Sequence, residues 1–191
     1  PNIKCELFEA SINEQTQQLL NGITELGIFS VPIEHQDNFE VLFRRDEELT
    51  AVFHKDSVFL EDGQKSVTLK DLEDVPLSLS SGCSEIVLKA FAQKSMVPRI
   101  TCTSTTRSTT LEWTRVKAAV SIVPVEEGED LGEEFVARPI SDITADVYKT
   151  VVKVKDRPLS VAAQHFLKFY SKTRNSQQVC DLDAILKSSA L

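Results

Sequence analysis

The sequence of 191 residues is poor in the patterns that mark specialised protein classes. Six glycines and seven prolines are too few for a low-complexity linker. No apolar run approaches the roughly 20 residues of a membrane-spanning helix, and the opening Pro-Asn-Ile-Lys-Cys-Glu lacks the basic start and apolar stretch of a secretory signal. Since 41% of the residues are hydrophobic, the sequence predicts a globular chain with a buried core, located in the cytoplasm and not in a membrane.

Basic charge is also scarce. Lysine and arginine number 21 against 29 aspartates and glutamates, for a formal net charge of -8. Nucleic-acid binding depends on a basic surface that neutralises phosphates, so the charge balance argues against direct contact between these residues and DNA. The acidic stretch 126–130 is expected to be a solvated loop.

The four cysteines, Cys5, Cys83, Cys102 and Cys180, are not arranged for metal binding. No CxxC pair is present, and no histidine lies at zinc-finger spacing. The sequence also lacks GxSxG, P-loop, HExxH and GxGxxG patterns. We therefore expect reduced cysteines, no metal, no cofactor and no enzymatic activity.

Alternating apolar segments predict an α/β protein rich in parallel strands. Residues 3–8 alternate as a strand does, residues 12–21 carry an apolar helical stripe that Gly22 closes, and residues 26–31 form a compact apolar strand. This order predicts a βαβ unit with parallel strands. Further strands are predicted at 40–43, 49–53, 76–80, 100–103, 119–123 (ended by Pro124), 135–137 and 147–154.

Three more helices are expected from their caps and apolar stripes. One follows Ser81-Gly82, one begins at Thr109 in a capping box with Glu112, and one begins behind Ser160. Their inward-facing residues are expected to be Val87, Leu88 and Phe91 in the first, Leu111, Trp113 and Val116 in the second, and Ala162, Phe166, Phe169 and Tyr170 in the third.

Five segments occur in an order that resembles a known family. They are Glu14-Gln15 with Leu19, Gly22 and Glu25-Leu-Gly-Ile28; Thr68-Leu-Lys-Asp-Leu72 with Pro76-Leu77; the helix and strand of residues 110–124; Val136-Ala-Arg-Pro-Ile140; and Arg157-Pro-Leu-Ser-Val-Ala-Ala-Gln-His-Phe166. Each motif alone is weak, but together they span nearly the whole chain and resemble the effector-binding domain of LysR-type transcriptional regulators. Lys117-Ala118-Ala119 stands where that family usually has glycines, which predicts a bulkier turn.

The resemblance implies a periplasmic-binding-protein-like fold, in which two Rossmann-like lobes are joined by two crossover strands and enclose a ligand cleft. Residues 1–50 with 152–191 would form the discontinuous lobe I, and residues 51–151 would form lobe II. Relative to the family, the sequence lacks the N-terminal DNA-binding domain and the first strand and helix of the module. The resemblance implies DNA contact only through that domain, and homodimers or tetramers that pair through the helices around 12–21 and 84–94.

Candidate ligand-binding residues follow from where such folds bind ligands. In open α/β sheets ligands lie beyond the carboxyl ends of strands, where helix N-termini favour anions. The residues at such turns are Ser11, Ser30, Ser80, Ser81, Gly82, Thr103, Ser104, Thr105, Thr106 and Arg107. Short hydroxyls can hold a carboxylate, and an arginine can bind one through two hydrogen bonds. Each hydroxyl is also an ordinary helix N-cap, Arg107 is equally an ordinary surface residue, and Ile12 rather than Ser11 stands where relatives keep a hydroxyl.

Cys83 offers a further interpretation. Its position at a helix N-terminus predicts a lowered thiol pKa, and peroxide-sensing members of the family carry a reactive cysteine at a similar place. Their second cysteine has no counterpart here, because Phe91 and Ala92 occupy that part of the helix. An inert Cys83 is the simpler expectation.

The leading hypothesis is a ligand-sensing and dimerisation module of a LysR-type regulator, with a small, carboxylate-bearing effector in the cleft. One alternative is a periplasmic-type solute-binding protein, which shares the fold. The other is a thiol-based redox sensor that acts through Cys83.

Overall fold

The computed structural model describes residues 4–30, 36–59, 63–173 and 177–178. The chain divides into two compact units: unit 1 comprises Pro1–Asp46 and Tyr148–Leu191, and unit 2 comprises Glu47–Val147. It passes between them twice, inside strand β2 (Phe39–His54) and at the start of strand β7 (Val147–Val154). No helix in the described ranges is long and apolar enough to cross a bilayer.

Unit 2 is built on a mixed sheet with a parallel half. Its elements are the short 3-10 helix η2 (Lys70–Leu72), β3 (Pro76–Ser80), α2 (Ser81–Gln93), β4 (Arg99–Ser104), α3 (Arg107–Arg115), β5 (Val120–Val125) and β6 (Phe135–Pro139). Strand β3 lies between β4 and β5 and runs parallel to both, and helices α2 and α3 form the connections. Strands β5 and β6 pair antiparallel with the part of β2 in this unit.

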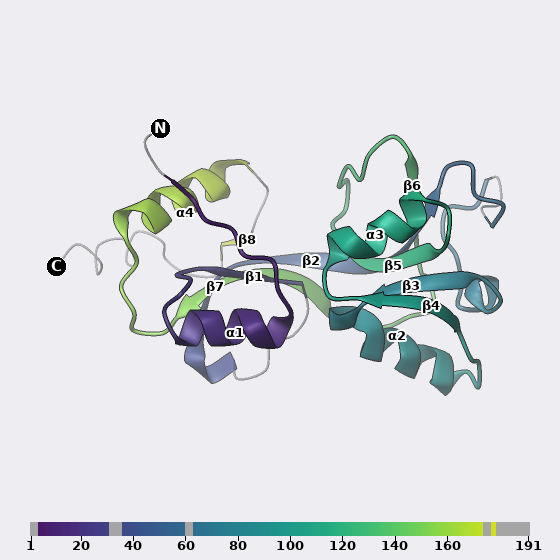
Figure 1. Ribbon diagram of the computed structural model, residues 1–191, viewed down its shortest axis with the longest axis horizontal. Coiled ribbons are helices and arrows are strands. Elements are labelled where there is room, and N and C mark those ends of the chain that lie inside the picture. Colours follow the sequence, from purple (N-terminus) through teal and green to yellow (C-terminus); the bar gives the residue numbers. More distant parts are fainter. Residues whose placement is uncertain (1–3, 31–35, 60–62, 174–176, 179–191) are drawn as a thin grey trace. The chain divides into compact units, whose positions relative to one another are not determined.

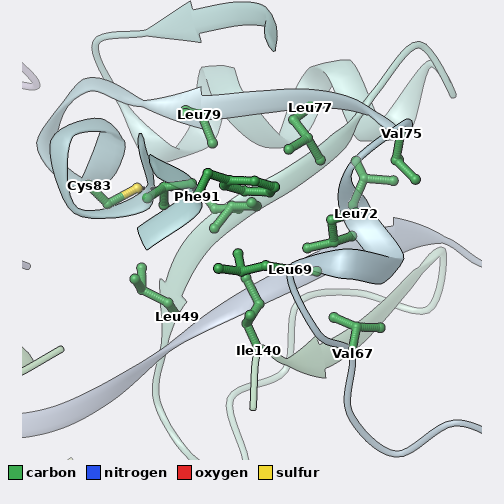
Figure 2. Close-up of a cluster of buried hydrophobic side chains, with 14 of the residues drawn as sticks. Leu49, Val67, Leu69, Leu72, Val75, Leu77, Leu79, Cys83, Phe91 and Ile140 are labelled. Carbon is green, nitrogen blue, oxygen red and sulfur yellow. Dashed lines mark hydrogen bonds between the residues drawn. The ribbon is translucent and has the colours of Figure 1, made fainter. Parts of the chain in front are cut away.

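Alternation along the strands divides unit 2 into an apolar layer and a hydroxyl-rich layer, because successive side chains of a strand point to opposite faces. Helices α2 and α3 lie on opposite sides of β3 and β4 (Figure 1). Leu77 and Leu79 of β3 join a buried cluster with Phe91 of α2, all with no exposed surface (Figure 2). Ser78, between the two leucines, instead points to the backbone of α3. Burying a side chain of the size of Phe91 contributes about 1.5–3 kcal/mol.

Unit 1 repeats the arrangement of helices on both faces of strands. Its elements are α1 (Ile12–Leu20), β1 (Gly27–Phe29), the 3-10 helix η1 (Gln36–Asn38), the first part of β2, β7, α4 (Val161–Thr173) and β8 (Gln177–Gln178). Val152 of β7 packs with Leu19 of α1, whereas the neighbouring Val151 packs with Leu167 of α4. Two separate small cores therefore hold the two helices.

Residues of the family-like motifs meet at helix ends in unit 1. The guanidinium of Arg157 donates hydrogen bonds to the last carbonyls of α1, to Leu19 O at 2.5 Å and Leu20 O at 2.9 Å. Glu25 accepts from the backbone N–H of Ser160 at 2.6 Å and from its Oγ at 2.8 Å. Ser160 Oγ in turn accepts from Ala163 N at 3.2 Å at the start of α4. These motif residues satisfy helix ends, which explains their spacing without any ligand.

The two α/β units confirm the predicted fold class, although several predicted elements were wrong. Residues 4–8 of the segment 3–8 form no strand, and Leu7 and Phe8 are exposed, because no strand in the described part of the chain pairs with them. Strand β1 therefore belongs to no βαβ unit and pairs antiparallel with β7. The segments 40–43 and 49–53 are parts of the single strand β2. Strand β5 continues through Pro124, which pairs in register with Leu49.

Some predicted helix faces were wrong as well. Helix α3 begins at Arg107 and is capped by Thr106 rather than by Thr109, and Leu88 and Val116 are exposed. The buried residues of α4 are Ala163 and Leu167, one position away from the predicted Ala162 and Phe166. Both faces of α4 carry apolar side chains, so the pattern alone did not identify the inward one.

Candidate functional site

The parallel pairing of β3 and β4 brings two of the predicted hydroxyl-rich turns side by side in unit 2. Leu79 is in register with Thr103, and Ser80 is in register with Ser104, the last residues of the two strands. Ser81 Oγ donates a hydrogen bond of 3.5 Å to Thr105 O across the two turns. The predicted residues of both turns therefore form one group at the carboxyl ends of neighbouring strands.

The N-terminus of α2 is suited to an anion. Ser80 occupies the N-cap position, but its side chain makes no capping hydrogen bond and instead lies 3.1 Å from Cys83 Sγ. The first amide groups of an α-helix have no partner within the helix and carry the positive end of its dipole. Ser81 is exposed and Gly82 is half-buried in this first turn, so hydroxyl and backbone donors are presented together.

The N-terminus of α3 is closed by its own side chain. Thr106 Oγ1 accepts from Thr109 N at 3.3 Å and lies 3.1 Å from the hydroxyls of both Ser108 and Thr109. Thr106 is therefore an ordinary N-cap. Thr103 is exposed on β4, whereas Ser104 is buried beside Cys102 Sγ at 3.5 Å.

Arg107, the first residue of α3, is not a solvated surface residue. Its Nη1 lies 3.1 Å from Glu129 Oε1 and 3.3 Å from Oε2, and the two side chains are only 24% and 20% exposed. Glu129 belongs to the segment predicted to be a solvated acidic loop, and this residue departs from that prediction. The sequence offered no signal for the pair, because 22 residues separate its members.

A layer of buried hydroxyls lies behind the site and was not predicted. Ser121 Oγ donates to Thr110 O at 2.8 Å and lies 2.6 Å from Thr114 Oγ1, which itself lies 3.4 Å from Val52 O. Thr110 and Thr114 are four residues apart on α3, a spacing that places both on one helix face. That pattern, together with Ser78 and Ser121 on strands, is a sequence signal for a polar helix–sheet interface.

The two candidates in unit 1 differ in their surroundings. Ser11 caps α1, and its hydroxyl both accepts from Glu14 N at 3.3 Å and donates to Glu14 Oε2 at 2.7 Å. The hydrogen bond from the Ser11 hydroxyl to this carboxyl, and a second one from Ser11 N to Oε2 at 3.0 Å, lower the pKa of Glu14. Ser30 is half-buried directly after β1. The capping box accounts for Ser11 without a ligand.

Cys83 does not have the predicted lowered pKa. The side chain has no exposed surface, and burial raises the pKa of the thiol despite hydrogen bonds involving Ser80. The Sγ atom points beneath α2 into the apolar cluster, 3.5 Å from Ile122 O, rather than out along the helix axis (Figure 2). A buried thiol of raised pKa is a poor nucleophile, so this geometry does not support a thiol sensor. Within the described ranges, no three His, Cys, Asp or Glu residues are grouped to hold a metal ion.

The solved structures that resemble this chain include regulators and their effector-binding or regulatory domains. The effector-binding domain of QuiR in complex with shikimate matches with a TM-score of 0.67 and 20% identity, over 88% of this chain and 82% of that one. The regulatory domain of Synechocystis CcmR in complex with 2-PG matches with a TM-score of 0.66 and 17% identity, over 86% and 81%. CbnR, a LysR family transcriptional regulator, matches with a TM-score of 0.64 and 22% identity, over 87% of this chain but 59% of its own.

The family model of the LysR substrate binding domain matches residues 1–174. No curated protein sequence matches significantly. Proteins with this domain are transcriptional regulators rather than enzymes. The chain belongs to the LysR substrate-binding domain family.

Proposed function

We propose that the chain senses a small anionic metabolite, and that unit 2 binds the anion at the carboxyl ends of β3 and β4. One observation carries the proposal: the register of Ser80 with Ser104 places two hydroxyl-rich turns next to each other. The uncapped N-terminus of α2 adds backbone donors and a positive helix end, both of which favour a carboxylate or phosphate. Ser81, Gly82 and Thr103 are the proposed contacts, and Ser11 and Ser30 stay predictions.

Two related domains make acids the first ligands to examine. The QuiR domain is in complex with shikimate and the CcmR domain with 2-phosphoglycolate. Both carry an anionic group, which is the chemistry that the donors around Ser81 are suited to hold. We propose a ligand of this class without choosing between a carboxylate and a phosphate.

A calorimetric and thermal-shift titration with shikimate, 2-phosphoglycolate and a panel of metabolite acids tests this site. Binding should raise the melting temperature of the native chain. The double variant Ser81→Ala, Thr103→Ala should weaken binding about a hundredfold or more, since it removes two hydrogen bonds to a charged group and each costs about 1.5–3 kcal/mol. Thr101→Ala, an exposed threonine of the same strand, is the matched control and should leave affinity unchanged. A ligand that binds the double variant as tightly as the native chain would remove the site assignment.

We also propose that the chain pairs through α1 and α2, as the resemblance predicts. Leu88 is 44% exposed on α2, and Ala92, one turn later, is exposed too. Light scattering should detect a dimer that Leu88→Glu dissociates, whereas a monomeric native chain at high concentration would contradict the interface.

For the whole regulator, we propose control of transcription in the cytoplasm through a DNA-binding domain of a longer protein.

A further inference from the structure

The Arg107–Glu129 pair lies on the same edge of the sheet as the proposed anion site, because Arg107 follows the carboxyl end of β4 and Glu129 follows that of β5, and both strands run parallel to β3. Arg107 begins α3 directly after the turn that follows Ser104. Both carboxylate oxygens of Glu129 approach a single nitrogen of Arg107, Nη1, at 3.1 and 3.3 Å. The protein therefore already places a carboxylate on the arginine that an anionic ligand would be expected to use.

The pair leaves part of the guanidinium unused. Arg107 Nε is buried and has no hydrogen-bond partner in the described part of the chain. An arginine binds an oxyanion best through two parallel N–H···O bonds from different nitrogens. A ligand carboxylate or phosphate that reached both Nε and Nη1 would form a better pair with Arg107 than Glu129 does, and it would satisfy the buried donor.

Glu129 is also tied to its own turn. Its Oε2 accepts from Glu126 N at 3.2 Å, and Glu129 N donates to Glu126 O at 3.1 Å. Moving the carboxylate away from Arg107 therefore disturbs a hydrogen bond that closes the turn of residues 126–129. The state of Arg107 and the conformation of this turn are coupled.

We propose that Glu129 is an internal competitor for Arg107 and a specificity-determining residue of the anion site. Only an anion that displaces the Glu129 carboxylate can form an ion pair with Arg107. This displacement breaks the hydrogen bond between Glu129 Oε2 and Glu126 N and opens the turn of residues 126–129. The conformation of the turn then depends on whether an anion is bound. This inference rests on the proposed function, because it assigns a regulation to the same site. The affinity of the native chain for an anion is lowered by the fraction of molecules in which Glu129 holds Arg107.

Titration with inorganic phosphate, followed by NMR of the Arg107 Nε–Hε group, tests the competition. Glu129→Gln should bind phosphate about twofold to fivefold more tightly than the native chain, since a partly exposed ion pair is worth up to about 1 kcal/mol. Glu127→Gln removes the same charge from an exposed position in the same turn and should change affinity little. Arg107→Lys identifies the NMR signal. Equal affinity in the native chain and Glu129→Gln, or an equal gain in Glu127→Gln, would overturn the inference.

The native chain provides a second readout that needs no variant. Saturating phosphate should shift the Arg107 Nε–Hε signal and the backbone amide of Glu126 together. Phosphate binding that shifts the first and leaves the second unchanged would overturn the displacement. The same titrations with shikimate and 2-phosphoglycolate separate the two proposals. If these acids bind equally to the native chain and to Glu129→Gln, the proposed function stands and only the competition is contradicted. If no anion binds, both proposals are contradicted.

Discussion

The two helices of unit 2 pack on the same strands by different chemistry. Helix α2 covers Leu77 and Leu79 with Val87 and Phe91, an apolar layer in which contacts are non-directional. Helix α3 covers the opposite face, where buried hydroxyls hold it through hydrogen bonds as short as 2.6 Å. Leu111 adds a partly buried apolar contact on that face.

This contrast gives the two interfaces different roles: the apolar α2 interface contributes mainly stability, and the hydrogen-bonded α3 interface fixes the position of its helix. An apolar layer tolerates small shifts, because burial depends on area and not on angle. A buried hydroxyl that loses its partner costs about 1–3 kcal/mol, so the α3 interface is specific for one position of the helix. Arg107 lies at the end of the helix that is held in this way.

The largest expected effect is on the α2 face. Phe91→Ala should lower the free energy of unfolding by about 3–5 kcal/mol, because it removes a fully buried ring and leaves a cavity. Val97→Ala, 82% exposed just beyond the same helix, should cost below about 1 kcal/mol. Urea unfolding followed by circular dichroism measures both, and a Phe91→Ala cost equal to that of Val97→Ala would contradict the assigned apolar layer.

The next effect is on the α3 face. Ser121→Ala should cost about 1–3 kcal/mol, since Thr110 O and Thr114 Oγ1 each lose a partner. Combining it with Thr114→Val should cost less than the sum of the two single changes, because the hydroxyls are coupled. Additive costs in this double-mutant cycle would show that the hydroxyls act separately. Ser84→Ala, on the outer side of α2, serves as the control.

A smaller effect concerns the C-terminal ends, where α2 and α3 are alike. Both end with a non-glycine residue in the left-handed region, Ser95 at φ 57° and Lys117 at φ 60°, whereas α1 ends with Gly22 at φ 73°. Ser95→Gly should raise the free energy of unfolding by up to about 1 kcal/mol. Lys117→Gly should gain less, because it also removes the exposed ion pair with Asp56. Gly22→Ala should destabilise, and a loss of stability in Ser95→Gly would contradict the strain argument.

The smallest expected effect is a pH dependence of the free energy of unfolding, which comes from Asp142 beside the C-terminal end of α2. Burial raises the pKa of Asp142, but hydrogen bonds from Lys94 Nζ and Leu69 N outweigh it and lower the pKa below its usual value of 3.8. The charged carboxylate therefore stabilises the fold above about pH 4, and this stabilisation is lost as the pH falls through the folded pKa. Asp142→Asn should cost about 0.5–1 kcal/mol at pH 7.

Chemical unfolding at several pH values measures this prediction. The difference between Asp142→Asn and the native chain should shrink below pH 4, whereas Asp74→Asn, at an exposed position, should show no such trend. A difference that is the same at pH 7 and pH 3 would contradict a role for the charge of Asp142.

The sequence predicted correctly those elements whose bounds depend on neighbouring residues in the chain. Strands 76–80 and 147–154 have the predicted bounds, and Gly22 ends the first helix as expected. The errors arose where tertiary contacts decide. Residues 4–8 alternate correctly but find no neighbouring strand, and the apolar residues on both faces of α4 hid which side is buried.

The positions of the candidate residues were predictable where they depend on element order alone. Hydroxyls between a strand and a helix placed Ser80, Ser81 and Thr103 at strand ends, where the structure has them; their role in binding stays a proposal. The partner of Arg107 was not predictable, since Glu129 reaches it only after the sheet has formed. The pKa of Cys83 was predicted from helix position alone, and the direction was wrong because burial dominates.

Because Cys83 is fully buried, the rate at which its thiol is modified measures how often unit 2 opens. A maleimide or disulfide reagent can reach the sulfur only in molecules whose second helix has lifted from the sheet. With the other three cysteines replaced by serine, the rate of modification at increasing urea would therefore give the free energy of that opening. A ligand that stabilises the closed form of unit 2 would lower the rate of Cys83 modification. A single thiol would then report ligand binding without any added fluorophore.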